Sequence, residues 1–345
     1  MLSVYGRGKN GLFSSRITAT FLASCFVVSL SQNLQAAEGG GTGFCLDSFC
    51  SSTARAAFKA CRYEFGDDFW IEVGKCNNLA DFEARIDCLQ EVRSSFAEER
   101  GVCGDQLDAR LDICDELGEA PYDPEINPDD FIDFSAVVGG GGYTPNPYFP
   151  LVPGTVWNYE AVDAEGEIFE KIKVEVLLET KEILGVNCIV VRDRVWEIDD
   201  EGEEVLIEDT DDWYAQDSEA GNVWYFGEVA RNFEDGELVD LEGSWKAGRE
   251  GDKAGILVYG EPEPNHMHRQ EFSLGNAEDM AQVVGFLDSL TVRSTTYNDV
   301  LQTREFTPIE PDVMEFKYYA PGIGTVLEEN PEDGERVELV EMITP

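Results

Sequence analysis

The two apolar runs IFEKIKVEVLL (Ile168–Leu178) and CIVVRDRVWEI (Cys188–Ile198) decide the fold class of this chain. Their β-branched and aromatic residues largely alternate with charged ones, which is the period-two pattern of a half-buried β-strand. Similar runs follow at Val223–Phe226, Ile256–Tyr259 and Phe316–Tyr319. Glycine turn signals separate several runs, at Glu165-Gly166, Glu201-Gly202, Asp235-Gly236 and Asp333-Gly334. Residues 143–345 are therefore predicted to form a mainly β, antiparallel meander of roughly ten strands, shaped as a barrel or a half-barrel.

Upstream of this domain, residues 38–118 are predicted to be a small α-helical module stapled by disulfides. Apolar residues from Leu79 to Phe96 step by three and four behind an Asn77-Asn78 cap, and this pattern stops before Gly101. A second helix is expected to carry Leu107 and Leu111 on one face. The module holds seven cysteines and no C-x-x-C pair, which favours disulfides over zinc: Cys45, Cys50, Cys61, Cys76, Cys88, Cys103 and Cys114.

Antiparallel geometry suggests how these cysteines pair, because residues equidistant from a tight turn face each other across a helical hairpin. A turn at Gly101 predicts Cys88 with Cys114, and a turn near Gly66-Asp67-Asp68 predicts Cys61 with Cys76. Cys103 is then left for Cys45 or Cys50.

The N-terminus predicts export. Residues 1–37 resemble a signal peptide, with basic residues before an apolar run and the small residues Ala36-Ala37 before Glu38. Leu22-Ala23-Ser24-Cys25 is a rival signal, a lipobox that would anchor a lipoprotein through Cys25, but the apolar run continues beyond it. No later stretch is apolar enough for a transmembrane segment. Residues 119–142, rich in Pro, Asp and Gly, are interpreted as a linker.

The charge balance restricts the partners. Asp and Glu number 70 against 25 Lys and Arg, a net charge of -45, while 43% of residues are apolar. The apolar content predicts a packed protein with an acidic surface, and that surface excludes nucleic acid and anionic membranes as partners.

Several motifs of the β domain carry a resemblance. They are Asp212–Asp217 (DWYAQD), Gly221–Glu228 (GNVWYFGE), Gly243–Gly248 (GSWKAG) and Lys317–Gly324 (KYYAPGIG). Together they resemble an uncharacterised family of exported bacterial proteins, from about Leu117 onward. The last motif also resembles the closing strands of periplasmic half-barrels of the lipoprotein-carrier, LolA-like type. The resemblance implies a periplasmic or extracellular location and a β fold, and it brings no assigned reaction.

Aromatic residues in neighbouring strands are the candidate ligand-binding residues. About half of them should line one inner face, which is either a solid core or the wall of a cavity. Arg269 and Glu271 are expected at the mouth of such a cavity. The candidate aromatic residues are Trp213, Tyr214, Trp224, Tyr225, Phe226 and Trp245.

Two sets of residues could ligate a metal. His266 and His268 would share one face of a strand as a half-site for copper, nickel or zinc, with Glu261, Glu263 or Glu271 nearby. A cluster of acids could hold calcium, although it lacks the spacing of a calcium-binding loop: Asp209, Asp211, Asp212 and Asp217. Solvated histidines and plain surface charge are the alternatives.

Catalytic signals are weak. The sequence has no G-x-S-x-G, H-E-x-x-H, P-loop or G-x-G-x-x-G motif, and Cys188 lies in an apolar run typical of a buried thiol. We therefore predict an exported acidic protein that binds an apolar small molecule, a lipid or a partner protein. Two alternatives stay open: an extracytoplasmic hydrolase with paired carboxylates, and a binding protein for divalent cations, calcium or copper.

Overall fold

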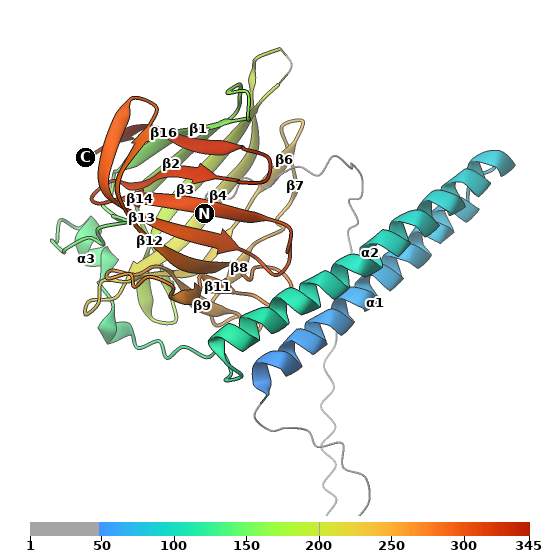
Figure 1. Cartoon of the computed structure of the whole chain (residues 1–345), viewed down its shortest axis with the longest axis horizontal. Coiled ribbons are helices and arrows are strands. Elements are labelled where there is room, and N and C mark those ends of the chain that lie inside the picture. Colours follow the sequence, from blue (N-terminus) through green and yellow to red (C-terminus); the bar gives the residue numbers. More distant parts are fainter. Residues whose placement is uncertain (1–47, 200) are drawn as a thin grey trace, which may run out of the picture.

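A computed structural model describes residues 48–199 and 201–345, in which a long two-helix hairpin precedes a large antiparallel sheet (Figure 1). The predicted signal peptide, Cys25, Cys45 and Asp200 lie outside the described residues. Within the described part, no helix combines the length and the apolar character needed to cross a bilayer.

The hairpin consists of α1 (Phe49–Asn77) and α2 (Phe82–Leu117). The 36 residues of α2 extend about 54 Å at 1.5 Å per residue. The predicted breaks at Gly101 and near Gly66 were wrong, because both glycines lie inside the helices. One glycine costs a helix only about 1 kcal/mol, which the packing of two cross-linked helices offsets. The chain reverses at 78–81, where the Asp81 side chain accepts the Ala84 N–H at 2.8 Å.

Three disulfides join the two helices, and the predicted pairings were wrong. Cys76 bonds to Cys88, Cys61 to Cys103 and Cys50 to Cys114, with sequence separations of 12, 42 and 64 residues. All three pairs are centred on residue 82, as one continuous antiparallel hairpin requires. Disulfides of this kind are typical of proteins that fold in an oxidising compartment.

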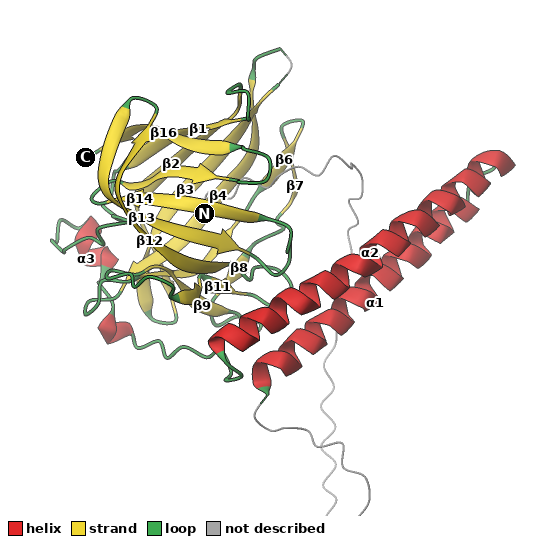
Figure 2. Cartoon of the chain, in the orientation of Figure 1, coloured by secondary structure: helices red, strands yellow, loops and turns green. Residues whose placement is uncertain are grey.

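The fold class was predicted correctly: the described residues form sixteen strands in one antiparallel sheet that is not closed by a continuous ladder (Figure 2). The first nine strands are β1 (Val156–Val162), β2 (Ile168–Ile183), β3 (Val186–Ile198), β4 (Glu204–Gln216), β5 (Val223–Val229), β6 (Asn232–Glu234), β7 (Glu237–Asp240), β8 (Trp245–Lys246) and β9 (Lys253–Val258). The remaining strands are β10 (Met267–Arg269), β11 (Glu271–Phe272), β12 (Met280–Val292), β13 (Thr295–Phe306), β14 (Met314–Ala320), β15 (Gly324–Glu329) and β16 (Arg336–Ile343).

The two ends of the sheet meet at one short segment of chain. The strand order runs β10-β12-β13-β14-β15-β16-β1-β2-β3-β4-β5-β9-β11, so β10 and β11 stand at opposite ends. Only Gln270 separates them in the sequence, and its side chain is fully buried. β10 pairs with β12, and β11 pairs with β9. We call residues 267–272 the seam, because this segment brings the open sheet around into a half-barrel with an interior, the lumen.

The segment predicted as a linker packs in part on the outer face of the sheet. It contains a 3₁₀ turn, Pro128–Asp130, and the short helix α3 (Phe134–Val138). The Phe134 side chain is fully buried, and the ring of Phe131 contacts those of Trp224 and Phe226. This cover explains why residues on the outer face of β4 and β5 are buried.

The base of the hairpin is fixed to the β domain, while its turn projects away (Figure 1). Arg110 of α2 forms a bidentate ion pair with Glu278, with Nη2–Oε1 and Nε–Oε2 distances of 2.7 and 3.0 Å, and both side chains are buried. The Gln106 side chain also donates to the Ile309 carbonyl at 2.8 Å. The chain connecting hairpin and sheet adds a bond from the Tyr122 hydroxyl to the Ala254 carbonyl.

Candidate functional site

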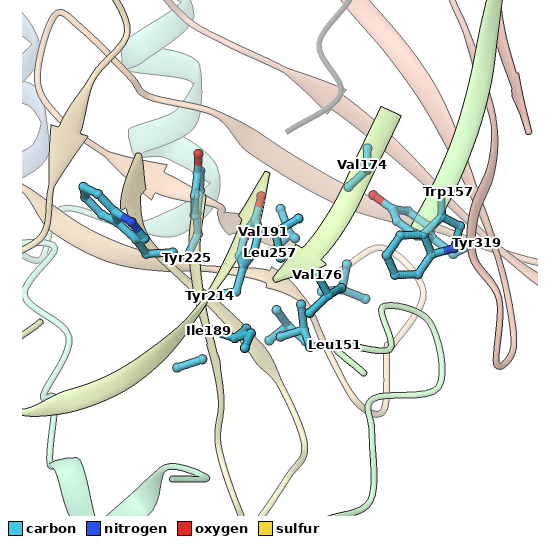
Figure 3. Packing of buried hydrophobic residues seen from close by; sticks show 14 of the residues in the cluster. Leu151, Trp157, Val174, Val176, Ile189, Val191, Tyr214, Tyr225, Leu257 and Tyr319 are labelled. Atoms are coloured by element: carbon cyan, nitrogen blue, oxygen red, sulfur yellow. The ribbon is translucent and has the colours of Figure 1, made fainter. Parts of the chain in front are cut away.

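The lumen of the half-barrel contains a cavity lined by both aromatic and charged side chains. The space between these side chains is about 540 Å³, including the part open to solvent. Its aromatic residues are Phe149, Trp157, Tyr159, Tyr214 and Tyr319, and its charged residues are Asp193, Asp212, Glu305, Lys317 and Glu328. Figure 3 shows Tyr214 on one side of the packed interior and Trp157 with Tyr319 on the other. The lining thus combines apolar rings with buried charged groups.

Strand alternation divides the predicted aromatic residues between the two faces of the sheet. Tyr214 and Tyr225 point inward and stack with ring centroids 4.7 Å apart, and Trp245 meets Tyr225 edge-on at 5.3 Å. Trp224 lies on the outer face, where its indole N–H donates to Asp217. Trp213 points to the opposite face of β4 from Tyr214. The Lys181 ammonium lies 5.4 Å from the centre of the Trp213 ring.

Lys317 lies among carboxylates at the β13–β15 side of the lumen. Its Nζ is 3.5 Å from an oxygen of Glu305 and 3.5 Å from one of Glu328, and all three side chains are buried. Burial alone would lower the pKa of Lys317, but these carboxylates raise it above its usual value. Burial raises the pKa of Glu328 to about 8 and that of nearby Glu315 to about 7, while Lys317 opposes both shifts.

A second group of acids lies at the β3–β5 side. The Tyr225 hydroxyl donates to Asp212 at 2.6 Å. Asp193 is 2% exposed, and its burial, reinforced by Asp212 and Glu208, raises its pKa well above the usual value. Burial and the charge of Asp212 likewise raise the pKa of Glu228 to about 8.

These shifts predict that the protein loses stability as the pH rises from 6.5 to 8.5. Glu228, Glu315 and Glu328 release protons in this range in the folded state, with pKa values of about 8, 7 and 8. In the unfolded chain they are already ionised, so the folded state binds more protons and stability falls as pH rises. His268 acts in the opposite sense only below this window, because burial lowers its pKa to about 4. Urea unfolding at the two pH values in high salt should show this loss as a lower free energy of unfolding at pH 8.5.

The Glu328→Gln variant provides the control for this prediction. Because it removes one of the three titrating carboxyls, its stability should change less between pH 6.5 and 8.5. A wild-type protein with equal stability at both pH values would contradict the prediction.

Arg269 and Glu271 do not lie together at the mouth of the cavity, as the sequence suggested. The Arg269 guanidinium packs under the hairpin, 5.5 Å from the ring centre of Tyr122 and 5.0 Å from that of Phe272. Glu271 is buried at the end of the seam, where burial, Asp279 and Glu228 raise its pKa. Glu271 thus belongs with the interior acids, whereas Arg269 packs against the rings of Tyr122 and Phe272.

The two histidines flank one tyrosine. The ring centroids of His266 and His268 lie 4.8 and 4.7 Å from that of Tyr259 and 6.0 Å from each other. His266 is exposed and His268 is buried, while Glu261 and Glu263 face solvent. Across residues 48–199 and 201–345, no group of three or more His, Cys, Asp or Glu side chains is placed to hold a metal ion.

The acids of the predicted calcium cluster have separate partners. Asp209 forms a bidentate ion pair with Arg192, and Asp211 forms an ion pair with Arg231 at 2.6 Å. Asp212 faces the lumen, on the opposite side of β4. Asp217 accepts the backbone N–H groups of Ala220 and Gly221 at 2.8 and 2.9 Å.

This separation predicts that calcium stabilises the protein no more than sodium does. Because the net charge is -45, both salts should raise the melting temperature gradually by screening repulsion. Melting curves in calcium chloride and sodium chloride at equal ionic strength should therefore coincide. A rise that saturates at low calcium and disappears in the Asp211→Asn, Asp212→Asn double variant would contradict this expectation.

Sequence reasoning missed several lumen residues: Asp193, Glu305, Lys317 and Glu328. The available signal was a charged residue at an inward position of an apolar strand. Asp193 lies between Arg192 and Arg194 in a strand whose neighbouring same-face positions, Val191 and Val195, are apolar. Cys188 is fully buried, in keeping with its apolar run, and burial raises the pKa of its thiol.

The sequence matches no family model, and no curated protein matches it significantly. Two solved structures are weakly similar. One is a candidate lipoprotein from Parabacteroides distasonis, with 13% identity over 58% of this chain and 100% of that chain, and a TM-score of 0.31. The other is a candidate exported protein with a YmcC-like fold from Bacteroides fragilis, with 12% identity, the same coverage and a TM-score of 0.32.

Proposed function

We propose that this chain is an exported binding protein whose β domain holds a small ligand in its lumen. The observation that carries the proposal is the mixed lining of the cavity, in which rings such as Tyr214 and Trp157 stand beside buried charges such as Asp193 and Lys317. Ligand sites typically combine apolar walls with a few convergent polar groups. A bare lipid chain fits this lining poorly, because an acyl chain offers no hydrogen-bond donor to the buried Oδ1 of Asp193.

Native mass spectrometry after gentle purification tests this proposal. We expect a bound small molecule that is lost in a Val174→Phe variant, because Val174 lines the cavity and a larger side chain would fill it. Val340→Phe is the matched control, since Val340 is an exposed position of β16. Empty spectra, together with no stabilisation by a panel of small molecules, would refute lumenal binding.

A hydrolase with paired carboxylates is the second candidate. Asp193 is paired with Thr210 in the β3–β4 ladder, so Asp193 and Asp212 are diagonal neighbours on the inner face. The raised pKa of Asp193 suits a general acid. Turnover of chromogenic glycosides or esters by the wild type, lost in Asp193→Asn, would favour this candidate over simple binding.

Export is tested separately by mass spectrometry of the mature N-terminus. We expect cleavage after Ala37, which gives a protein starting at Glu38. A diacylglyceryl group on Cys25 would instead establish an anchored lipoprotein.

A further inference from the structure

We infer that the lumen binds an organic cation with several ammonium groups, that is, a small linear amine. This inference rests on the proposed lumenal binding and names its ligand class. It is carried by the excess of acidic over basic side chains in the lining, by one oxygen of a buried carboxyl group that has no hydrogen-bond partner, and by the aromatic walls.

Acidic side chains outnumber basic ones in the cavity lining. Four carboxylates line it, and Lys317 is the one cation among the described lining residues. Lys317 lies at one side, between Glu305 and Glu328. The β3–β4 side, with Asp193 and Asp212, therefore presents acid to the cavity with no ammonium or guanidinium among the lining residues there.

Asp193 provides the independent observation. Its side chain is 98% buried and lines the cavity, and its Oδ1 has no hydrogen-bond partner among the described residues. The adjacent arginines cannot serve it, because strand alternation points Arg192 and Arg194 to the outer face. There Arg192 binds Asp209, and Arg194 lies 3.7 Å from Glu175. An ammonium group of a ligand would supply the missing donor to Oδ1 and would favour the ionised form of Asp193, which burial disfavours.

The aromatic walls suit an ammonium ion and the methylene chain that links two of them. The faces of Tyr and Trp rings attract cations, and their apolar surface packs against CH₂ groups. Lys317 already places such a group in the lumen, with a four-carbon stem entering from β14 and its ammonium between two carboxylates. A ligand with ammonium groups a few carbons apart would repeat this arrangement toward Asp193.

The carboxylates are spread over the lumen wall. Asp193 and Asp212 come from β3 and β4, while Glu305 and Glu328 come from β13 and β15. Acids distributed in this way match N–H donors spaced along a flexible chain better than they match a single ion with one compact ligand shell.

Isothermal titration calorimetry of the purified protein with spermidine tests the inference, and 1,4-butanediol serves as an uncharged probe. The variants are Asp193→Asn and, as a matched control, Asp288→Asn, which removes the same charge from an exposed position of β12. We expect saturable spermidine binding in the wild type and in Asp288→Asn, and at least tenfold weaker binding in Asp193→Asn. Butanediol should not bind.

The acidic surface makes this control essential, because any polycation will associate with it weakly. Equal spermidine affinity in Asp193→Asn and Asp288→Asn would overturn the inference and assign the binding to the surface. If Asp193→Asn does not fold, the cavity-filling Val174→Phe variant takes its place and should also lose binding.

The outcomes separate this inference from the proposed function. A neutral or anionic molecule found in the lumen by native mass spectrometry, with no spermidine binding, would preserve the proposed function and refute the amine class. An empty lumen without spermidine binding would refute both. Calcium chloride that displaces spermidine at matched ionic strength more effectively than sodium chloride would likewise favour a metal ion and refute the amine.

Discussion

Replacing Lys317 with Met is expected to destabilise the protein by about 3–5 kcal/mol at pH 8, the largest effect of any single substitution in the lumen. The ammonium lies 3.5 Å from both Glu305 and Glu328, and it also offsets the charges of Glu315 and Asp279. Without it, these carboxylates would be buried with no compensating cation. Urea unfolding of wild type and variant at pH 8 measures the difference.

The loss should shrink at pH 5.5, because protonation of the buried acids removes the charges that Lys317 compensates. Lys171→Met is the matched control, since Lys171 pairs with Glu204 at 2.6 Å on the exposed surface and should contribute less than about 1 kcal/mol. Equal stability of Lys317→Met and wild type at pH 8 would contradict the described arrangement of charges in the lumen.

Replacing Arg110 with Met should destabilise the docked hairpin by a similar amount, about 3–5 kcal/mol, because Glu278 would be left buried without its cation. Glu278 is 2% exposed, and apart from Arg110 its Oε1 accepts only the Gly275 N–H at 2.8 Å in the described part of the chain. Urea unfolding should show the loss. Limited proteolysis should also cut the connection between hairpin and sheet, residues 119–127, faster than in the wild type.

The double variant Arg110→Met, Glu278→Met should recover much of this stability, because two apolar side chains replace the buried pair. Lys253→Met is the exposed control, since Lys253 pairs with Asp123 at the surface. A single Arg110→Met variant with wild-type stability and wild-type proteolysis would show that the ion pair does not hold the hairpin.

The helical hairpin shows what the cysteine spacing could predict. Equal distance from a turn was the correct rule, but it was applied to turns at Gly101 and Gly66 that do not exist. The spacings between the cysteines are sufficient to predict the pairing. Cysteines in α1 are 11 and 15 residues apart and those in α2 are 15 and 11 apart, so the pattern is a mirror image about residue 82. Both spacings are close to whole helical turns, which favours two uninterrupted helices.

The sheet was predictable as a class, whereas its interior was not. Period-two runs and glycine turns identify the strands, but they do not tell which face of each strand is inside. Bulges change that face within a strand. Tyr225 and Glu228 of β5, although three residues apart, both pair with inward-facing residues of β4, Tyr214 and Asp212. The acids of the lumen come from strands far apart in the sequence, so only the pairing of strands brings Asp193 near Lys317.

The seam also has a consequence for the motions of the protein. β10 is held by three paired positions and β11 by two, against eleven between β12 and β13. Opening free energies in a native protein scale with such local contacts, so amide hydrogens of the seam should exchange with solvent before those of the long strands. The seam can therefore unfold locally while the rest of the sheet stays folded.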